Sequence, residues 1–258
     1  MYQLIGIIEF VLNIIYPPRC ILCQEIIPIK NNHICKNCCY DDYLIKGNRC
    51  EKCSRQIQNT SKKLCRDCEN QNHSYEKGFA LFEYTGKIKG ALYRLKYSGD
   101  KEVGKALGNL IVKYYKKEIQ NCKIDLIIPV PSHPSKIRKR GYNQAQVIAK
   151  QISKDFKIPL RNDILIRIKN TRPQSKLSRK QRTNNLIGAF KLNKQIDKSV
   201  KNILIVDDIY TTGSTIENCS KILKQNEDIK IYFVTATIVI VNKEKEGKED
   251  GCTFMSKM

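Results

Sequence analysis

Eight cysteines in the first third of the chain form a repeat, and their spacing constrains the fold more than any other feature. The second set of four follows the first at a shift of 30 residues, and each set contains two CxxC motifs separated by eleven residues. Two residues between thiolates let one tight turn direct both sulfurs at one ion, and a second turn completes a tetrahedral site. We therefore predict two structural zinc sites. Their ligands are Cys20, Cys23, Cys35 and Cys38, then Cys50, Cys53, Cys65 and Cys68.

The same cysteines allow other arrangements. Disulfide bonds are disfavoured in a chain that we expect in the cytosol, where thiols stay reduced. A cross-braced pairing, in which the first CxxC motifs of both sets share one ion, fits the spacing, although the repeat favours sequential pairing. Four thiolates leave no open coordination position, so each site serves folding rather than catalysis. The module either stabilises a segment poor in apolar residues or provides a surface for docking or for nucleic acid, and these interpretations remain open. We interpret Cys39 as a bystander, and His33 and His73 as surface residues.

The chain divides into four segments. Apolar residues recur at helical spacing in residues 1–16 and predict an amphipathic helix. The zinc module covers residues 17–77, an α/β domain covers 78–241, and a charged tail that we expect to be disordered covers 242–258. The longest apolar stretches, residues 4–15 and 231–241, are 12 and 11 residues long, short of the roughly 18 to 20 that span a bilayer. Because Glu9 also interrupts the first stretch, we expect no signal peptide, no membrane span and a cytoplasmic location.

Positive charge is concentrated in one part of the chain. The net charge is +22 overall, and residues 131–182 alone contribute +13. Such a concentration indicates a polyanionic ligand, either a phosphate compound or a nucleic acid. A solvated lysine-rich surface is the alternative for the scattered lysines.

From about residue 78, predicted strands alternate with predicted helices. This alternation favours a mostly parallel sheet, which binds ligands at the carboxyl ends of its strands. The predicted strands are residues 79–84, 126–130, 203–206 and 229–241, and the predicted helical faces are 88–95, 103–114, 145–156 and 215–225.

The most specific motif is ILIVDDIYTTGST, residues 203–215. An apolar strand is followed by two carboxylates and then by a Thr/Gly/Ser loop that opens a helix. Small side chains, exposed backbone N–H groups and a helix N-terminus together make an anion site. Because Asp207 and Asp208 would repel phosphate, we predict that they bind sugar hydroxyls or a divalent ion, next to a phosphate on the loop. The predicted loop ligands are Thr211, Thr212, Gly213, Ser214 and Thr215.

This block resembles the 5-phosphoribosyl 1-pyrophosphate (PRPP) signature of type I phosphoribosyltransferases. The order of the cysteine module, the RGxNQ element at residues 140–144, a second basic block at 167–190 and the PRPP loop is similar to that of ComF/ComFC-type competence proteins. The resemblance implies a type I phosphoribosyltransferase fold, a mostly parallel sheet with flanking helices, behind a double zinc ribbon. It also implies a cytoplasmic factor for natural transformation that acts on internalised single-stranded DNA, with a competence helicase as a possible partner.

In a transferase, the basic segment would stabilise the leaving pyrophosphate together with magnesium. We assign Asp207, Asp208 and Arg140 as catalytic and place Ser132, Lys136 and Arg138 beside the pyrophosphate. Three further arginines follow on a loop that could close over the site or bind DNA. They are Arg172, Arg179 and Arg182.

No acceptor pocket is recognisable, so whether the chain is an enzyme stays open. One alternative is an active transferase that moves ribose 5-phosphate from PRPP to a nitrogenous acceptor in metabolism. Another is a DNA-binding protein that retains the PRPP site, with Tyr142, Tyr93 or Tyr97 available for base stacking. A PRPP-sensing regulator is a third, although no helix-turn-helix is evident.

Overall fold

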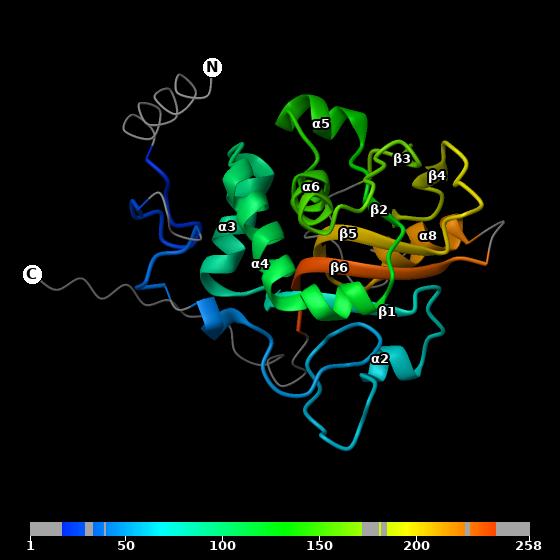
Figure 1. Cartoon of the computed structure of the whole chain (residues 1–258), viewed down its shortest axis with the longest axis horizontal. Coiled ribbons are helices and arrows are strands. Elements are labelled where there is room, and N and C mark those ends of the chain that lie inside the picture. The colour runs from blue at the N-terminus through cyan, green and yellow to red at the C-terminus, as the bar shows by residue number, and fades with distance from the viewer. Residues whose placement is uncertain are drawn as a thin grey trace, which may run out of the picture.

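The computed structural model describes residues 17–28, 33–38, 40–171, 181, 185–224 and 228–240. A central sheet has the strand order β1 (Lys77–Glu83), β6 (Lys230–Ile238), β5 (Asn202–Tyr210) and β2 (Leu126–Pro129), and every neighbouring pair is parallel (Figure 1). This arrangement confirms the predicted parallel sheet. The flanking helices are α3 (Gly86–Tyr97), α4 (Lys101–Asn121), α5 (Pro134–Arg140), α6 (Gln144–Phe156) and α8 (Ser214–Leu223).

Strand β5 separates two apolar cores. Successive side chains of a strand point to opposite faces of the sheet, so Leu204 and Val206 belong to the core shared with α3, α4 and α6. Ile203 and Ile205 belong to the core shared with α8. All four side chains are fully buried, as expected for a parallel sheet with helices on both faces. The continuous apolar run in the sequence therefore marks a central strand.

Several elements differ from the sequence prediction. Strand β5 continues to Tyr210, so Asp207 and Asp208 lie within its last residues instead of after its end. Helix α5 and a short antiparallel pair, β3 (Leu165–Arg167) and β4 (Phe190–Leu192), were not predicted, because three-residue strands and a seven-residue helix carry little periodicity. The described part of the chain contains no helix with the length and apolar character to cross a membrane.

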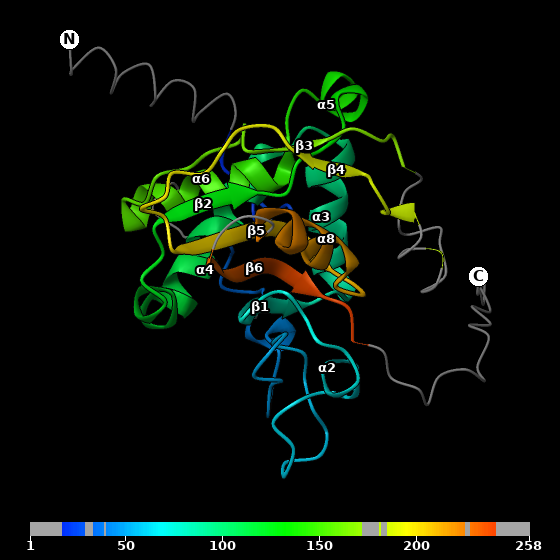
Figure 2. The same ribbon diagram turned by 90° about the vertical axis from the view of Figure 1, so that its right-hand side faces the viewer.

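The cysteine module folds as two ribbons that repeat the same backbone hydrogen bonds. Cys20 N–H donates to Glu25 O at 2.8 Å, and Cys50 N–H donates to Arg55 O at 2.7 Å, 30 residues later. The first ribbon packs into the core with α3 and α4, whereas the second packs into the core with α8. Figure 2 shows the second ribbon, with its short helix α2 (Arg66–Glu69), next to the edge strand β1. The predicted helix at 1–16 and the tail at 242–258 lie outside the described residues.

Candidate functional site

The eight cysteines form two separate groups of four, as sequential pairing requires. Within each group the ligand atoms all lie within 4.8 Å of one another. The Sγ atoms of Cys23 and Cys35 are 3.5 Å apart, and those of Cys53 and Cys65 are 3.6 Å apart. A tetrahedral zinc with Zn–S bonds of about 2.3 Å has edges of about 3.8 Å, while a disulfide would be about 2.05 Å. Both groups therefore fit one zinc ion each, and the cross-braced pairing is wrong.

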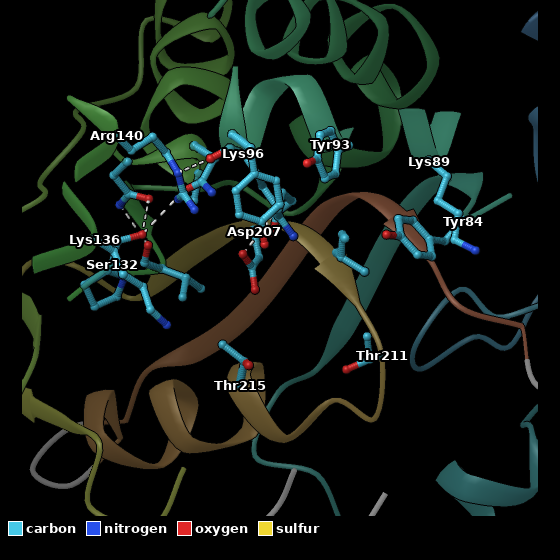
Figure 3. Close-up of a pocket in the computed structure, with 18 of the residues that line it drawn as sticks. Tyr84, Lys89, Tyr93, Lys96, Ser132, Lys136, Arg140, Asp207, Thr211 and Thr215 are labelled. Carbon is cyan, nitrogen blue, oxygen red and sulfur yellow. Dashed lines mark hydrogen bonds and ion pairs between the residues drawn. The ribbon is translucent and has the colours of Figure 1, made fainter. Parts of the chain in front are cut away.

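A large cleft lies at the carboxyl ends of β2 and β5, where the parallel sheet was expected to bind its ligand. Its volume is about 1360 Å³. Helix α3 forms one side with Tyr93, Lys96 and Tyr97, and β5 contributes Asp207 and Asp208 (Figure 3). The other sides come from the β2–α5 segment, the start of α6, β3 and the loop before α8. Their lining residues include Ser132, Lys136, Arg140, Asn143, Gln144, Arg167, Thr211 and Thr215.

A partly buried ion pair lies at the centre of the cleft. Lys96 Nζ is 2.7 Å from an Oδ of Asp208. Burial alone lowers the pKa of an amine, but the charge of Asp208 outweighs it and raises the pKa of Lys96. Burial and the charge of Asp208 raise the pKa of Asp207 well above its ordinary value. The two carboxylates thus differ: Asp208 is paired with Lys96, whereas the charged form of Asp207 is disfavoured and would be stabilised by a hydrogen-bonding ligand.

Further positively charged side chains lie around this ion pair. We define the cationic cluster as Lys96, Lys136, Arg140 and Arg167, which all line the cleft. Burial, with the charges of Arg167 and Arg140, lowers the pKa of Lys136 to about 8. Burial also lowers the pKa of Arg167. An anion bound among these cations would relieve their mutual repulsion, so the electrostatics of the cluster favour an anionic ligand.

The RGxNQ element builds the junction between α5 and α6. Gly141 has φ of 85° and ends α5 in the left-handed conformation, which glycine adopts without a Cβ penalty. Asn143 Nδ2 donates to Val130 O at 2.9 Å, and Ser132 Oγ donates to Asn143 Oδ1 at 3.1 Å. Arg140 Nε donates to Lys96 O at the end of α3. The motif therefore holds the end of β2, the start of α6 and the end of α3 around one cleft.

The predicted phosphate loop connects β5 to α8. Thr211 and Thr215 line the cleft. Gly213 has φ of 81°, and a Cβ there would lie 2.4 Å from the Tyr210 hydroxyl, so the turn requires glycine. Thr212 and Ser214 face each other across the turn, with their hydroxyls 2.8 Å apart. The loop has the small side chains and the helix N-terminus on which the anion-site prediction rests.

The structure brings most of the predicted site residues together. Ser132, Lys136, Arg140, Asp207, Asp208, Thr211 and Thr215 all line the cleft. Arg138 does not: it lies on the exposed side of α5 and is absent from the cleft lining. Helix periodicity explains this, because Arg138 is two residues from both Lys136 and Arg140 and so points away from them. Arg172, Arg179 and Arg182 lie outside the described residues.

Two aromatic predictions have different outcomes. Tyr142 is buried, and its hydroxyl donates to Leu95 O, so its predicted availability for base stacking is wrong. Tyr93 and Tyr97 are 62% and 60% exposed and lie side by side, with ring centroids 4.8 Å apart. Their rings border the cleft and are open to a planar ligand.

His73 was predicted at the surface, but its side chain is buried against Glu217.

Three residues that line the cleft were not predicted from the sequence: Lys96, Lys89 and Tyr84. Lys96 follows Leu92 by four residues, at the edge of the apolar stripe of α3. That position carries a weak signal, since lysines often border such a stripe with their charge in water. Only the packing of α3 against the end of β5 turns this lysine toward Asp208.

In the central parallel sheet, strand β5 ends with an acidic pair and is followed by a Thr/Gly/Ser loop and helix α8. This arrangement defines a phosphoribosyltransferase-fold protein, and the chain adds a double zinc ribbon to it. Family models agree: "Phosphoribosyl transferase domain" matches residues 101–258, and "Double zinc ribbon domain" matches residues 11–69. The chain is 31% identical over 222 residues to "Competence protein F" of Haemophilus influenzae, covering 83% of this chain and 95% of that protein. It therefore belongs to the family of competence protein F and ComFC.

More distant relatives carry related names. "Competence protein ComFC" of Bacillus subtilis is 26% identical over 197 residues, which cover 74% of this chain and 77% of that protein. "DNA utilization protein YhgH" of Escherichia coli is 26% identical over 194 residues, which cover 69% of this chain and 84% of that protein.

Proposed function

We propose that the chain binds PRPP in the cleft and acts in natural transformation on internalised single-stranded DNA in the cytoplasm. One observation carries the PRPP assignment. The cationic cluster, the acidic pair and the Thr/Gly/Ser loop border a single cleft. PRPP presents a pyrophosphate, a ribose and a 5′-phosphate in that order, and each part matches one of these three groups.

Each group of residues has a distinct task in this proposal. The loop between β5 and α8 binds the 5′-phosphate through backbone N–H groups and the hydroxyls of Thr211 and Thr215. Asp207 accepts hydrogen bonds from ribose hydroxyls, which stabilise its ionised form. Lys136 and Arg140, with Ser132, bind the pyrophosphate.

Magnesium fits this site as a companion of the pyrophosphate. Lys96 already neutralises Asp208 at 2.7 Å, so the acidic pair is a poor site for a divalent ion of its own. Mg²⁺ usually retains several waters and binds through substrate phosphates. In this proposal the ion neutralises part of the charge on the pyrophosphate, and the chain's own cations neutralise the rest. The two cysteine groups hold zinc as structural ions.

The role in DNA uptake draws on the relatives and on the rim of the cleft. Two relatives are named competence proteins and a third is named a DNA utilization protein. Tyr93 and Tyr97 are exposed aromatic rings, and the Arg140 guanidinium lies 5.9 Å from the ring centroid of Tyr97. Aromatic platforms beside cations bind the bases and backbone of single strands. The net charge of +13 in residues 131–182 adds attraction for the backbone.

An active transferase is the second candidate, and the size of the cleft favours it. A volume of about 1360 Å³ leaves room beside PRPP for a planar acceptor against the tyrosines. In that reaction the anomeric C–O bond breaks, pyrophosphate leaves with the bonding electrons, and an acceptor nitrogen forms the new C–N bond. The cationic cluster would then stabilise the charge that develops on the leaving group.

Calorimetric titration tests the PRPP and DNA sites, and a pyrophosphate-release assay separates the two candidates. PRPP with magnesium is titrated into the full chain, alone and then with a single-stranded oligonucleotide present. The proposal requires saturable PRPP binding and a separate, strongly salt-dependent affinity for the oligonucleotide. Absence of PRPP binding would reject the site assignment. Release of pyrophosphate from PRPP on addition of one member of a nucleobase and amine panel would favour the transferase instead.

A further inference from the structure

The second zinc ribbon contacts the phosphate loop through one buried arginine. Arg55 lies in this ribbon, two residues after Cys53, and is only 9% exposed. Its Nη2 donates to Thr211 O at 2.9 Å, and its Nη1 forms an ion pair with Asp67 of the same ribbon. The guanidinium thus connects the ribbon that carries the second cysteine group to the loop that we propose binds the 5′-phosphate.

The first ribbon shows that the ribbon fold does not itself need this arginine. Glu25 occupies the position equivalent to Arg55, 30 residues earlier, and its carbonyl accepts the same backbone hydrogen bond. The side chain of Glu25 is exposed. Two ribbons with the same backbone pattern therefore carry opposite charges at this position. The buried arginine is explained by what lies outside the second ribbon, which is the loop.

The contact fixes the orientation of one peptide plane. In a trans peptide the C=O of Thr211 and the N–H of Thr212 point in opposite directions. Arg55 holds the carbonyl on the ribbon side, so the N–H of Thr212 points away from the ribbon. A loop that binds an anion needs its N–H groups turned to the ligand and its carbonyls turned away. If this peptide rotated, a carbonyl oxygen would face the phosphate and repel it.

Further contacts tie the segment after the second ribbon to the same region. Ser74 donates to the carboxylate of Glu217 on α8 through its N–H at 2.9 Å and its hydroxyl at 2.8 Å. The hydroxyls of Tyr75 and Tyr210 are 2.9 Å apart and buried. The Tyr210 hydroxyl occupies the space that a Cβ at Gly213 would need. The segment that follows the second ribbon therefore stabilises the phosphate loop and the first turn of α8.

We propose that Arg55 is a positioning residue, and that the second zinc ribbon and the phosphate loop are energetically coupled through it. The inference rests on the proposed PRPP function and adds a regulatory link to it. Zinc in the second ribbon orders Arg55, and Arg55 presets the loop for a ribose 5′-phosphate. Because coupling is reciprocal, a bound ribose phosphate stabilises the second zinc site in turn.

Arg55→Gln in the full chain tests the positioning role. We expect affinity for PRPP and for ribose 5-phosphate to fall about tenfold, the scale of one lost hydrogen bond to a charged group. Affinity for inorganic pyrophosphate should stay unchanged, because that part of the site lies at Ser132 and Lys136. General destabilisation would weaken all three ligands alike. Arg66→Gln is the matched control, since Arg66 is an exposed arginine of the same ribbon.

Zinc release from the wild-type chain gives a second measurement that needs no variant. A chelator should extract one of the two ions more slowly when ribose 5-phosphate is present, and Arg55→Gln should abolish the protection. Equal release rates with and without ribose 5-phosphate would overturn the coupling, as would unchanged ribose 5-phosphate affinity in Arg55→Gln. A wild-type chain that binds neither PRPP nor ribose 5-phosphate would instead overturn the proposed function and the inference together.

Discussion

Lys136 offers a quantitative test of the pyrophosphate site, because its lowered pKa lies in an accessible pH range. Its amine donates to Thr171 O at 3.1 Å. Burial, with the charges of Arg167 and Arg140, places its pKa at about 8. A pyrophosphate bound among these cations would favour the charged amine and raise this pKa again. At Lys136, binding should therefore take up a proton, and more of it as the pH rises.

The size of the effect follows from the pKa. With a value of about 8, about nine tenths of Lys136 is protonated at about pH 7 and about one tenth at about pH 9. When the protonated amine is the form that binds, PRPP affinity falls about tenfold between these two pH values. The direction is fixed by the sign of the shift: the ligand-free amine has the lower pKa, so affinity is intact below about pH 8 and declines above it.

Calorimetry in two buffers of different ionisation enthalpy measures both the affinity and the proton uptake. We expect Lys136 to contribute an uptake of about 0.1 proton near pH 7 and about 0.9 proton near pH 9, measured as the difference from Lys136→Arg, because ionisation of Asp207 on binding contributes equally in both proteins. Lys136→Arg is the matched control, because arginine stays protonated throughout and should remove the decline. A wild-type affinity that is constant over this range would refute the reasoning. An equal decline in Lys136→Arg would refute it too.

Three further outcomes test the other parts of the assignment. Metal analysis should find two zinc ions per chain, and Cys50→Ser should unfold the second ribbon and lower the content to about one, since structural zinc binding is largely folding energy; a content of two in the variant would contradict this. Replacing Asp207 and Asp208 by asparagine together should abolish detectable PRPP binding with zinc content unchanged, and retained affinity would reject their role at the ribose. Changing Tyr93 and Tyr97 to alanine should weaken binding of single strands by roughly 1–3 kcal/mol per stacked base and leave the salt slope unaltered, because no charge is removed. Wild-type affinity in that variant would exclude the tyrosines as a base platform.

Features confined to a short stretch of sequence were predicted well. A CxxC motif brings its two sulfurs together within one turn, so the ligand sets could be read from spacing, and the 30-residue repeat favoured the sequential pairing that the structure has. The strand, acidic pair and loop of residues 203–215 likewise lie in one continuous segment. Even there the predicted end of the strand was wrong. Two aspartates are unfavourable in a strand, so the strand was predicted to stop before Asp207, although Asp207 and Asp208 both belong to β5.

The orientation of individual side chains was predicted less well, because it depends on how each helix lies in the fold. Arg138 and Arg140 were treated alike from their shared charge, yet of these two only Arg140 lines the cleft. Tyr142 was grouped with the exposed tyrosines, but the junction between α5 and α6 buries it against Leu95. A basic or aromatic residue in a loop gives no sign of its orientation until the flanking elements are placed.

Three features follow from the sequence alone: the two cysteine groups, the alternation of strands and helices that makes a parallel sheet, and the small polar residues of the loop before α8. Each is a local pattern, in which residues a few positions apart meet through the geometry of a turn, strand or helix. The ion pair of Lys96 with Asp208 and the hydrogen bond from Arg55 to Thr211 O depend instead on the tertiary fold. These partners are far apart in the chain, and the packing of α3 and of the second ribbon against the end of β5 brings them within bonding distance. Local propensity carries no information about such contacts, because they exist only after the apolar faces have been buried.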